Sequence, residues 1–190
     1  MYIYIVGALI GYFLGCISPS YIIASLKKKD IRAHGSGNLG ASNTVILLGA
    51  KWGILVGAID ILKAFIPVIV AKLVFADLVL LPYIVAVCAI MGHIFPFYLK
   101  FKGGKGTATF FGSMLGLNPL AFVIIGLIFL IVTFTTDYIV LGTYTVIILF
   151  PIYLFFVAGV CPMLIMLVAS GVVASKHRAN VVRIIKKEEI

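Results

Sequence analysis

The sequence predicts an all-α integral membrane protein with about seven transmembrane helices, or with five and a re-entrant hairpin. Of its 190 residues, 63% are hydrophobic and only 11% are charged. A small soluble fold cannot bury so large an apolar fraction, because it leaves much of its chain at the surface. The apolar residues also occur in long runs, and ~20 helical residues are enough to cross a bilayer.

The apolar runs follow one another along the whole chain, with no linker and no convincing repeat between them. We therefore expect a single transmembrane domain over residues 1–190. The run 107–117 is shorter than the others and ends at the turn signal Asn118-Pro119, so it is either a tilted helix or one arm of a re-entrant pair. The long runs cover residues 2–26, 52–76, 78–99, 119–136, 138–158 and 160–175.

The positive charges predict the topology. The chain has 15 Lys and Arg against 6 Asp and Glu. All of these cations except Lys63 and Lys72 lie in residues 27–51, 100–106 and 176–190. An odd number of crossings places the three segments on one side of the membrane, which the positive-inside rule identifies as the cytoplasm. We therefore expect the N-terminus outside and the C-terminus in the cytoplasm.

Other classes of protein fit the sequence poorly. The net charge of +9 is not arranged as a basic stripe interleaved with exposed aromatic residues, so nucleic-acid binding is not expected. Cys16, Cys88 and Cys161 lie singly in apolar runs and are interpreted as buried small hydrophobic residues, without a disulfide or a metal site. The first apolar run lacks a basic start and is long enough to span, which argues against a cleaved signal peptide.

The first cytoplasmic segment contains a loop rich in Gly, Ser and Asn. Residues 35–43 read Gly-Ser-Gly-Asn-Leu-Gly-Ala-Ser-Asn and lead into the short apolar run 44–50. Backbone N–H groups and the start of a helix can together face an anion in such an arrangement. A flexible surface turn is the alternative, because loops favour the same residues.

The second segment brings lysines and glycines together. Residues 101–109 read Phe-Lys-Gly-Gly-Lys-Gly-Thr-Ala-Thr, a pattern that does not have the spacing of a nucleotide-binding P-loop. Lysine ammonium groups and uncluttered backbone amides can nevertheless bind phosphate together. The alternative is a tight basic turn that only obeys the positive-inside rule, which accounts for the lysines and not for three glycines.

Two further sets of polar residues accompany these loops. If residues 176–183 are helical, His177, Asn180 and Arg183 share one face, although a basic helix end resting on anionic lipid is the alternative. Within the second span, Asp60 and Lys63 lie one turn apart, where a structural ion pair is favoured over contact with substrate. The three cytoplasmic segments together predict a site for a phosphorylated ligand with an apolar part, in either an enzyme or a carrier.

These motifs resemble those of the bacterial acyl-phosphate:glycerol-3-phosphate acyltransferases. The similarity rests on residues 35–43, on Gly-His-x-Phe-Pro at 92–96 with 101–109, and on His-Arg-x-Asn at 177–180, and it extends over the whole chain. It implies transfer of a fatty acyl group from acyl phosphate to the 1-hydroxyl of glycerol 3-phosphate, giving lysophosphatidic acid and phosphate. It also implies the bacterial inner membrane, a cytoplasmic active site, no cofactor or metal, and no obligatory protein partner.

The resemblance also implies roles for individual residues. Ser36, His177 and Asn180 would be catalytic, whereas Asp60, Lys63 and Glu189 would be structural or supporting. The proton acceptor would be either His177 or the phosphate of the donor. The implied substrate-binding residues are Gly35, Gly37, Asn38, Gly40, Asn43, His93, Lys102, Gly103, Gly104, Lys105, Gly106, Thr107 and Arg178.

Two features bear on the donor and on the activity. The His-x4-Asp dyad of the other acyltransferase class is absent, because His34, His93 and His177 are not followed by Asp at that spacing. The family usually carries an Arg three residues after the first-motif Asn, and this chain has Ile46 there. A divergent paralogue with weak or altered activity is therefore an alternative, and a carrier for phosphorylated solutes is a third hypothesis.

Overall fold

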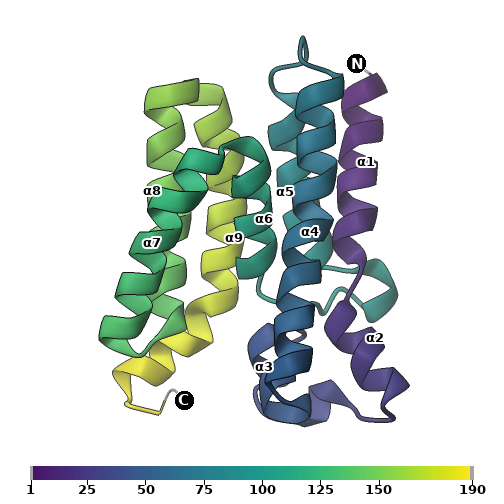
Figure 1. Cartoon of the computed structure of the whole chain (residues 1–190), viewed down its shortest axis with the longest axis vertical. Helices are drawn as coiled ribbons and strands as arrows, with labels where there is room; N and C mark the ends of the chain where they lie inside the picture. Colours follow the sequence, from purple (N-terminus) through teal and green to yellow (C-terminus); the bar gives the residue numbers. More distant parts are fainter. Residues whose placement is uncertain (1, 189–190) are drawn as a thin grey trace. The chain divides into compact units, whose positions relative to one another are not determined.

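The computed structural model describes residues 2–188, and every regular element in this range is a helix (Figure 1). The described residues form two compact units that divide between Leu117 and Asn118. Six helical segments among them are long and apolar enough to cross a membrane. The predicted all-helical class is therefore confirmed, whereas seven crossings, the orientation of the termini and a single domain over residues 1–190 stay predictions.

The N-terminal unit contains four apolar helices and the short helices that connect them. The helix α6 has eleven residues, so it is only ~16 Å long and covers about half of a ~30 Å hydrocarbon core. The elements are α1 (Tyr2–Cys16), α2 (Pro19–Leu26), η1 (Ile31–Ala33), α3 (Ala41–Leu48), α4 (Ala50–Val74), α5 (Leu81–Ile94), η2 (Phe97–Leu99) and α6 (Thr107–Leu117).

The first predicted span is broken into two helices. Proline has no N–H and restricts the residue before it, so Ser18 leaves the helical region and α2 begins at Pro19. The break frees backbone groups, and the hydroxyl of Tyr98 satisfies two of them. It donates to the carbonyl oxygen of Cys16 at 2.9 Å and accepts from the N–H of Ser18 at 3.3 Å. The carbonyl oxygen of Ile17 is free to receive a side chain from another helix.

Small residues let α1 and α5 pack closely. A Cβ at Gly11 would lie 2.6 Å from the carbonyl oxygen of Val85, and a Cβ at Gly15 would overlap the carbonyl of Ala89. In a membrane protein, where lipid is as apolar as a side chain, such close backbone approach is a main source of helix association. Because of this contact, α1 orients the end of α5, which leads into the second loop.

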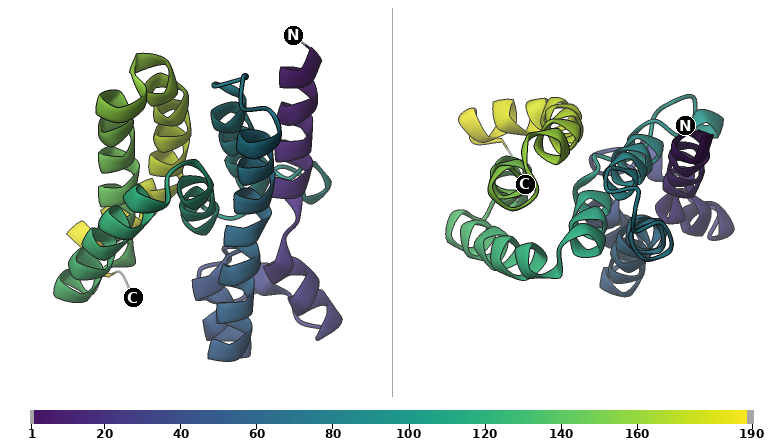
Figure 2. Two further views of the ribbon diagram at one scale, coloured as in Figure 1. Left: turned by 45° about the horizontal axis from the view of Figure 1, so that its top comes forward. Right: turned by 90° about the horizontal axis from the view of Figure 1, so that it is seen from above.

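The C-terminal unit is a group of three helices, α7 (Pro119–Thr136), α8 (Ile139–Ala158) and α9 (Val160–Ile185). The helix α8 packs against both of the others, and Figure 2 shows it antiparallel to the first part of α9. Asn118 caps α7, because its Oδ1 accepts from the N–H of Ala121 at 3.0 Å. The helix α9 runs ten residues beyond the predicted end of its span at residue 175, so its last turns carry the third motif.

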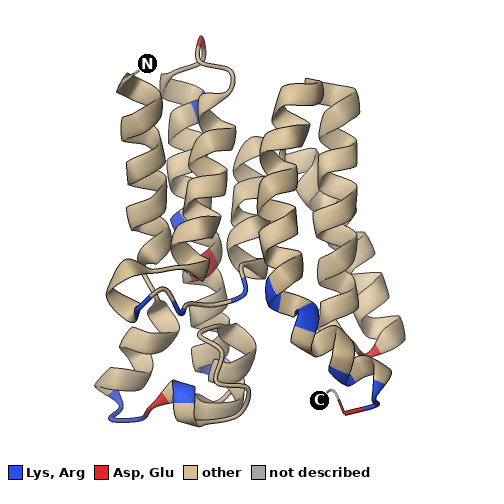
Figure 3. Cartoon of the chain, turned by 180° about the vertical axis from the view of Figure 1, so that it is seen from behind, with Lys and Arg blue, Asp and Glu red and all other residues tan. Residues whose placement is uncertain are grey.

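The charges are separated from the apolar helices as the sequence predicts. In each unit, the Lys and Arg positions gather toward one end of the helices, apart from Lys63 and Lys72 on α4 (Figure 3). The three cysteines are free, but only Cys16 is buried, so the prediction of three buried thiols is wrong for Cys88 and Cys161. Cys161 is exposed on an apolar helix, because lipid takes the place of a protein core around a membrane protein.

Candidate active site

The first polar loop is folded around the side chain of Asn43. The Nδ2 group of Asn43 donates to the carbonyl oxygens of Ile31 and His34 at 3.0 and 3.1 Å. The Oδ1 atom of Asn43 accepts from the N–H of Ser36 at 3.0 Å. One side chain on the first turn of α3 therefore holds the loop at three points.

These bonds change the interpretation of Asn43. It is 1% exposed, and both of its amide hydrogens are used within the loop, so it has no donor left for a ligand. The bonds show that Asn43 holds the loop, and its direct contact with substrate stays a prediction. Gly35 and Gly37, with φ of +55° and +65°, let the loop turn in the left-handed region. Ser36 is exposed and Asn38 is half-buried, so both remain available to a ligand.

The second loop, residues 95–106, caps the C-terminal end of α5. The last carbonyl groups of a helix have no partner within it. Here the N–H groups of Gly103 and Gly104 donate to the carbonyl oxygens of Ile94 and His93 at 3.0 and 3.1 Å. A Cβ at Gly103 would overlap the carbonyl oxygen of His93, and a Cβ at Gly104 would overlap the ring of His93. The glycines are therefore required by close packing.

The same contacts correct the prediction for Gly103 and Gly104. Their amides were expected to bind phosphate, but the carbonyl groups of α5 already occupy them. In the same loop Lys102 is exposed and Lys105 is half-buried, and their role in binding an anion stays a prediction. Gly106, with φ of +95°, then turns the chain into the first turn of α6, where the helix carries its partial positive charge.

The first and second loops meet within the N-terminal unit, as the sequence predicted. The guanidinium of Arg32, just before the first loop, donates to the carbonyl oxygen of Leu99 in the second at 3.4 Å. Ile31, Leu39 and Leu99 belong to one buried apolar cluster that joins the two segments. The carbonyl oxygen of Leu39 also borders Gly104, at 2.7 Å from where a Cβ would lie.

A buried ionic cluster of Asp60, Lys63 and His93 lies beside the second loop. The Nζ atom of Lys63 is 2.7 Å from Oδ1 of Asp60 and 2.8 Å from Nδ1 of His93. It also donates to the carbonyl oxygen of Ile17, at the break between α1 and α2, at 2.6 Å. The Asp60–Lys63 ion pair expected from the sequence is present. His93, expected only to contact substrate, is its third member.

The third motif lies on α9 of the C-terminal unit. His177 and Asn180 are each 5% exposed, whereas Arg178 is exposed, so the predicted division of this helix into two faces is confirmed. Arg183 is half-buried on the side of His177 and Asn180. The contribution of these residues to a common site with the two loops stays a prediction.

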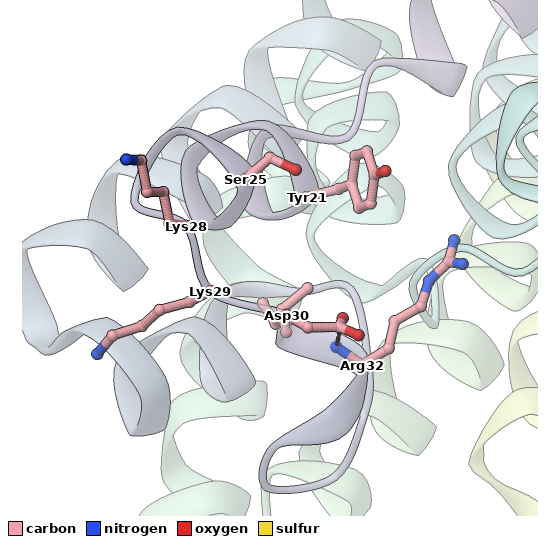
Figure 4. A pocket seen from close by; sticks show the side chains of 7 residues that line it. Tyr21, Ser25, Lys28, Lys29, Asp30 and Arg32 are labelled. Carbon is pink, nitrogen blue, oxygen red and sulfur yellow. Dashed lines mark hydrogen bonds between the residues drawn. The ribbon is translucent and has the colours of Figure 1, made fainter.

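A recess of about 410 Å³ lies next to the first loop, between the end of α2 and the segment that leads into η1. Figure 4 shows Arg32 reaching past the ring of Tyr21, with the Arg32 Cζ atom 5.5 Å from the ring centre. The backbone N–H of Arg32 is held by Oδ1 of Asp30 at 2.9 Å. None of the lining residues belongs to residues 35–43 or 101–109, so the recess is separate from the two loops. Its lining comprises Tyr21, Ser25, Lys28, Lys29, Asp30, Ile31 and Arg32.

Comparison with known proteins decides the family. The model of the family described as glycerol-3-phosphate acyltransferase matches residues 5–187. The chain belongs to the glycerol-3-phosphate acyltransferase family. Glycerol-3-phosphate acyltransferase 1 of Oceanobacillus iheyensis is 38% identical over 98% of this chain and 93% of its own. The glycerol-3-phosphate acyltransferase of Bacillus subtilis is 39% identical over 95% of this chain and 93% of its own.

Two solved structures show the same fold as this acyltransferase. Both are crystal structures of PlsY (YgiH), an integral membrane glycerol 3-phosphate acyltransferase, in a glycerol 3-phosphate form and a lysophosphatidic acid form. The first has a TM-score of 0.93 and 31% identity, and the second has 0.90 and 30%. Each match covers 98% of this chain and 94% of the PlsY chain. The acyltransferase is therefore a multi-pass integral membrane protein.

Two positions bear on how this acyltransferase differs from its family. Ile46, where an Arg is usual, is 64% exposed on α3. A cation at so exposed a position contributes about 1 kcal/mol or less to holding an anion, so the substitution matters less than it would at a buried, charge-paired site. Glu189, the expected C-terminal acid, lies outside the described residues.

Sequence reasoning missed three contacts around the loops. Arg32 was counted only as a topological charge, yet it bridges the two loops. The carbonyl group of Ile17 was not considered, although Ser18-Pro19 signals a break that frees it. His93 lies 30 residues from Lys63 along the chain, and no spacing rule connects them.

Proposed function

We propose that this enzyme transfers a fatty acyl group from acyl phosphate to the 1-hydroxyl of glycerol 3-phosphate, giving lysophosphatidic acid and phosphate. The observation that carries the proposal is that the first loop, with Ser36 and Asn38, meets the second loop, with its lysines and glycines, in a chain of this family. The names of the relatives and the two forms of PlsY support glycerol 3-phosphate as the acceptor and lysophosphatidic acid as the product.

The histidines favour acyl phosphate as the donor. Enzymes that use a His-x4-Asp dyad need a histidine that an aspartate orients toward the hydroxyl. The His–Asp contact found here joins His93 and Asp60, with Nδ1 and Oδ1 3.4 Å apart, and both residues are buried. Lys63 forms an ion pair with Asp60 and a hydrogen bond with His93, so this pair does not match such a dyad.

The chemistry requires two anionic substrates to be held together. Acyl phosphate is a mixed anhydride, so its carbonyl carbon is already activated and phosphate is the leaving group. The 1-hydroxyl oxygen forms the new ester bond as the bond to phosphate breaks, and the hydroxyl proton passes to His177 or to the departing phosphate. Proximity alone contributes several kcal/mol to such a reaction.

Each group then has one task. Lys102 and Lys105 bind the phosphate of glycerol 3-phosphate and offset the repulsion between the two anions. Ser36 and Asn38, on the loop that Asn43 holds, donate to the carbonyl group or to the phosphate of the donor. His177 and Asn180 complete the site from α9. The acyl chain lies in a groove between spans, in contact with lipid.

The proposal extends to topology and location. The protein lies in the bacterial inner membrane, with its basic loops on the cytoplasmic side and its N-terminus outside. The support is the separation of cations in each unit and the bacterial source of the relatives. The short helix α6 then counts as the fourth of seven crossings, or as one arm of a re-entrant hairpin.

The test is an acyl-transfer assay on purified protein in lipid nanodiscs. Acyl phosphate and glycerol 3-phosphate should give lysophosphatidic acid and phosphate in equal amounts, whereas acyl coenzyme A should give neither. Lys105→Ala should lower kcat/KM about a hundredfold, as removal of a charged donor does. The matched control is Lys100→Asn, because Lys100 is exposed in the same loop and its φ of +56° suits asparagine. No product from well-folded wild-type protein would refute the proposal.

The carrier hypothesis finds little support in the N-terminal unit. A carrier needs ionisable groups that face a pathway through the membrane. Three ionisable residues of α4 beyond its first turn, Asp60, Lys63 and Lys72, are instead bonded within the unit. Asp60 and Lys63 pair with each other, and Lys72 donates to the carbonyl oxygen of Leu117 at 2.7 Å.

A further inference from the structure

Three ionisable side chains are buried together where α4 and α5 pack against the break between α1 and α2. Asp60, Lys63 and His93 are 1%, 6% and 7% exposed. Ionisable residues within a membrane protein are costly and usually serve a function. Asp60 and Lys63 alone would form a neutral pair, so the presence of His93 needs a separate explanation.

The hydrogen bonds of Lys63 decide the state of the His93 ring. An ammonium group has three hydrogens and no acceptor. Lys63 forms an ion pair with Asp60, and its Nζ atom lies within hydrogen-bond distance of the carbonyl oxygen of Ile17 and of Nδ1 of His93. The Nδ1 atom must therefore accept. The remaining ring hydrogen is then on Nε2. The cluster as a whole is neutral, and its geometry selects one tautomer of the imidazole.

The selected hydrogen points toward the second loop. Within residues 2–188, the polar contacts of the His93 side chain, with Lys63 and Asp60, are made through Nδ1. The Nε2 atom is the His93 atom nearest to where a Cβ of Gly104 would lie. Glycine at 104 therefore leaves the donor edge of the ring against the loop, next to Lys105.

We propose that Asp60 and Lys63 are positioning residues that hold His93 in the Nε2–H tautomer, and that His93 donates this hydrogen to the phosphate of glycerol 3-phosphate bound at residues 102–106. The inference rests on the proposed function for its substrate. The neutral His93 ring gives the phosphate a directed hydrogen bond in addition to its attraction to the lysines. No further charge has to be buried for this bond. The three residues then act on acceptor binding and have no contact with the acyl donor.

Steady-state kinetics separate this role from a structural one. Lys63→Met should raise KM for glycerol 3-phosphate at least tenfold and change KM for acyl phosphate less than threefold. The matched control is Lys72→Met, because Lys72 also lies on α4 and is bonded to a backbone carbonyl. It should leave both KM values within twofold. Equal increases of both KM values in Lys63→Met, or no increase, would overturn the proposal.

A second pair of variants covers the case in which Lys63→Met fails to fold. The amide nitrogen of a glutamine can occupy the place of the imidazole Nε2, so His93→Gln should keep KM for glycerol 3-phosphate at least fivefold lower than His93→Leu does. Equal KM values in the two variants would exclude a hydrogen bond from this position.

Nitrogen-15 spectra of histidine-labelled protein test the tautomer without any turnover. The His93 ring should show an unprotonated Nδ1 and a protonated Nε2, assigned by comparison with His93→Gln, and the pattern should change in Lys63→Met. A protonated Nδ1 in the wild-type protein would refute the positioning role. If the wild-type protein has no acyltransferase activity but shows this tautomer, the proposed function fails while the structural basis of the inference stands.

Discussion

Replacement of Asn43 by alanine should loosen the first loop, because the Asn43 side chain holds this loop at three points. The change removes three hydrogen bonds, to Ile31, His34 and Ser36, at a residue that is 1% exposed. At roughly 1 kcal/mol for each bond, the free energy of local opening falls by about 3 kcal/mol. This corresponds to an equilibrium constant for local opening that is about a hundredfold larger.

Hydrogen exchange measured by mass spectrometry or NMR reads this opening directly, because the N–H of Ser36 donates to the Asn43 side chain. The amide of Ser36 should exchange about a hundredfold faster in Asn43→Ala, while amides within α4 keep their rates. The matched control is Asn118→Ala, which loses the single capping bond to Ala121. Unchanged exchange at Ser36 would refute the positioning role of Asn43. In the same variant, kcat/KM should fall because the loop is less ordered.

Three further changes test the packing and the charge of the site. Gly104→Ala should abolish most acyl transfer while the protein stays folded, because the new methyl group overlaps His93 and meets the carbonyl oxygen of Leu39; an assay with more than half of the wild-type rate would contradict this. Tyr98→Phe removes both hydrogen bonds at the helix break and should lower the free energy of unfolding by about 2 kcal/mol, seen as a lower melting temperature in detergent. Ile46→Arg should change kcat/KM less than tenfold, and any gain should vanish at high salt because the position is exposed; a larger gain that persists in salt would show a buried charge pair.

Much of the fold could be predicted because lipid leaves a simple pattern in the sequence. Runs of apolar residues and the cations between them located the long helices, and both ends of α4, α7 and α8 agree with the prediction within a few residues. The break at Ser18-Pro19 was missed because the apolar run continues through it, and hydropathy averages over a single proline. The extension of α9 to Ile185 was missed because its last turns are helical but polar, and hydropathy ends a span where the apolar residues end.

The candidate site was predictable in its composition and less so in its bonding. The first and second loops meet as expected, because each follows a span that ends on the same side. Which backbone amides stay open for a ligand depends on three-dimensional pairing, and the carbonyl groups at the end of α5 take those of Gly103 and Gly104. Asn43 looked like a ligand residue for the same reason, since sequence shows that an amide side chain is present and not what it bonds to.

Because the end of α5 is capped, the second loop loses its conformational entropy when the chain folds and not when a ligand binds. Because the amides of Gly103 and Gly104 are bonded to the helix, residues around Lys102 and Lys105 are ordered as the chain folds and before any substrate arrives. A ligand then loses little affinity to loop ordering. Two lysines on a preorganised backbone can therefore bind a small phosphate ester that a flexible basic tail with more charges would hold only weakly.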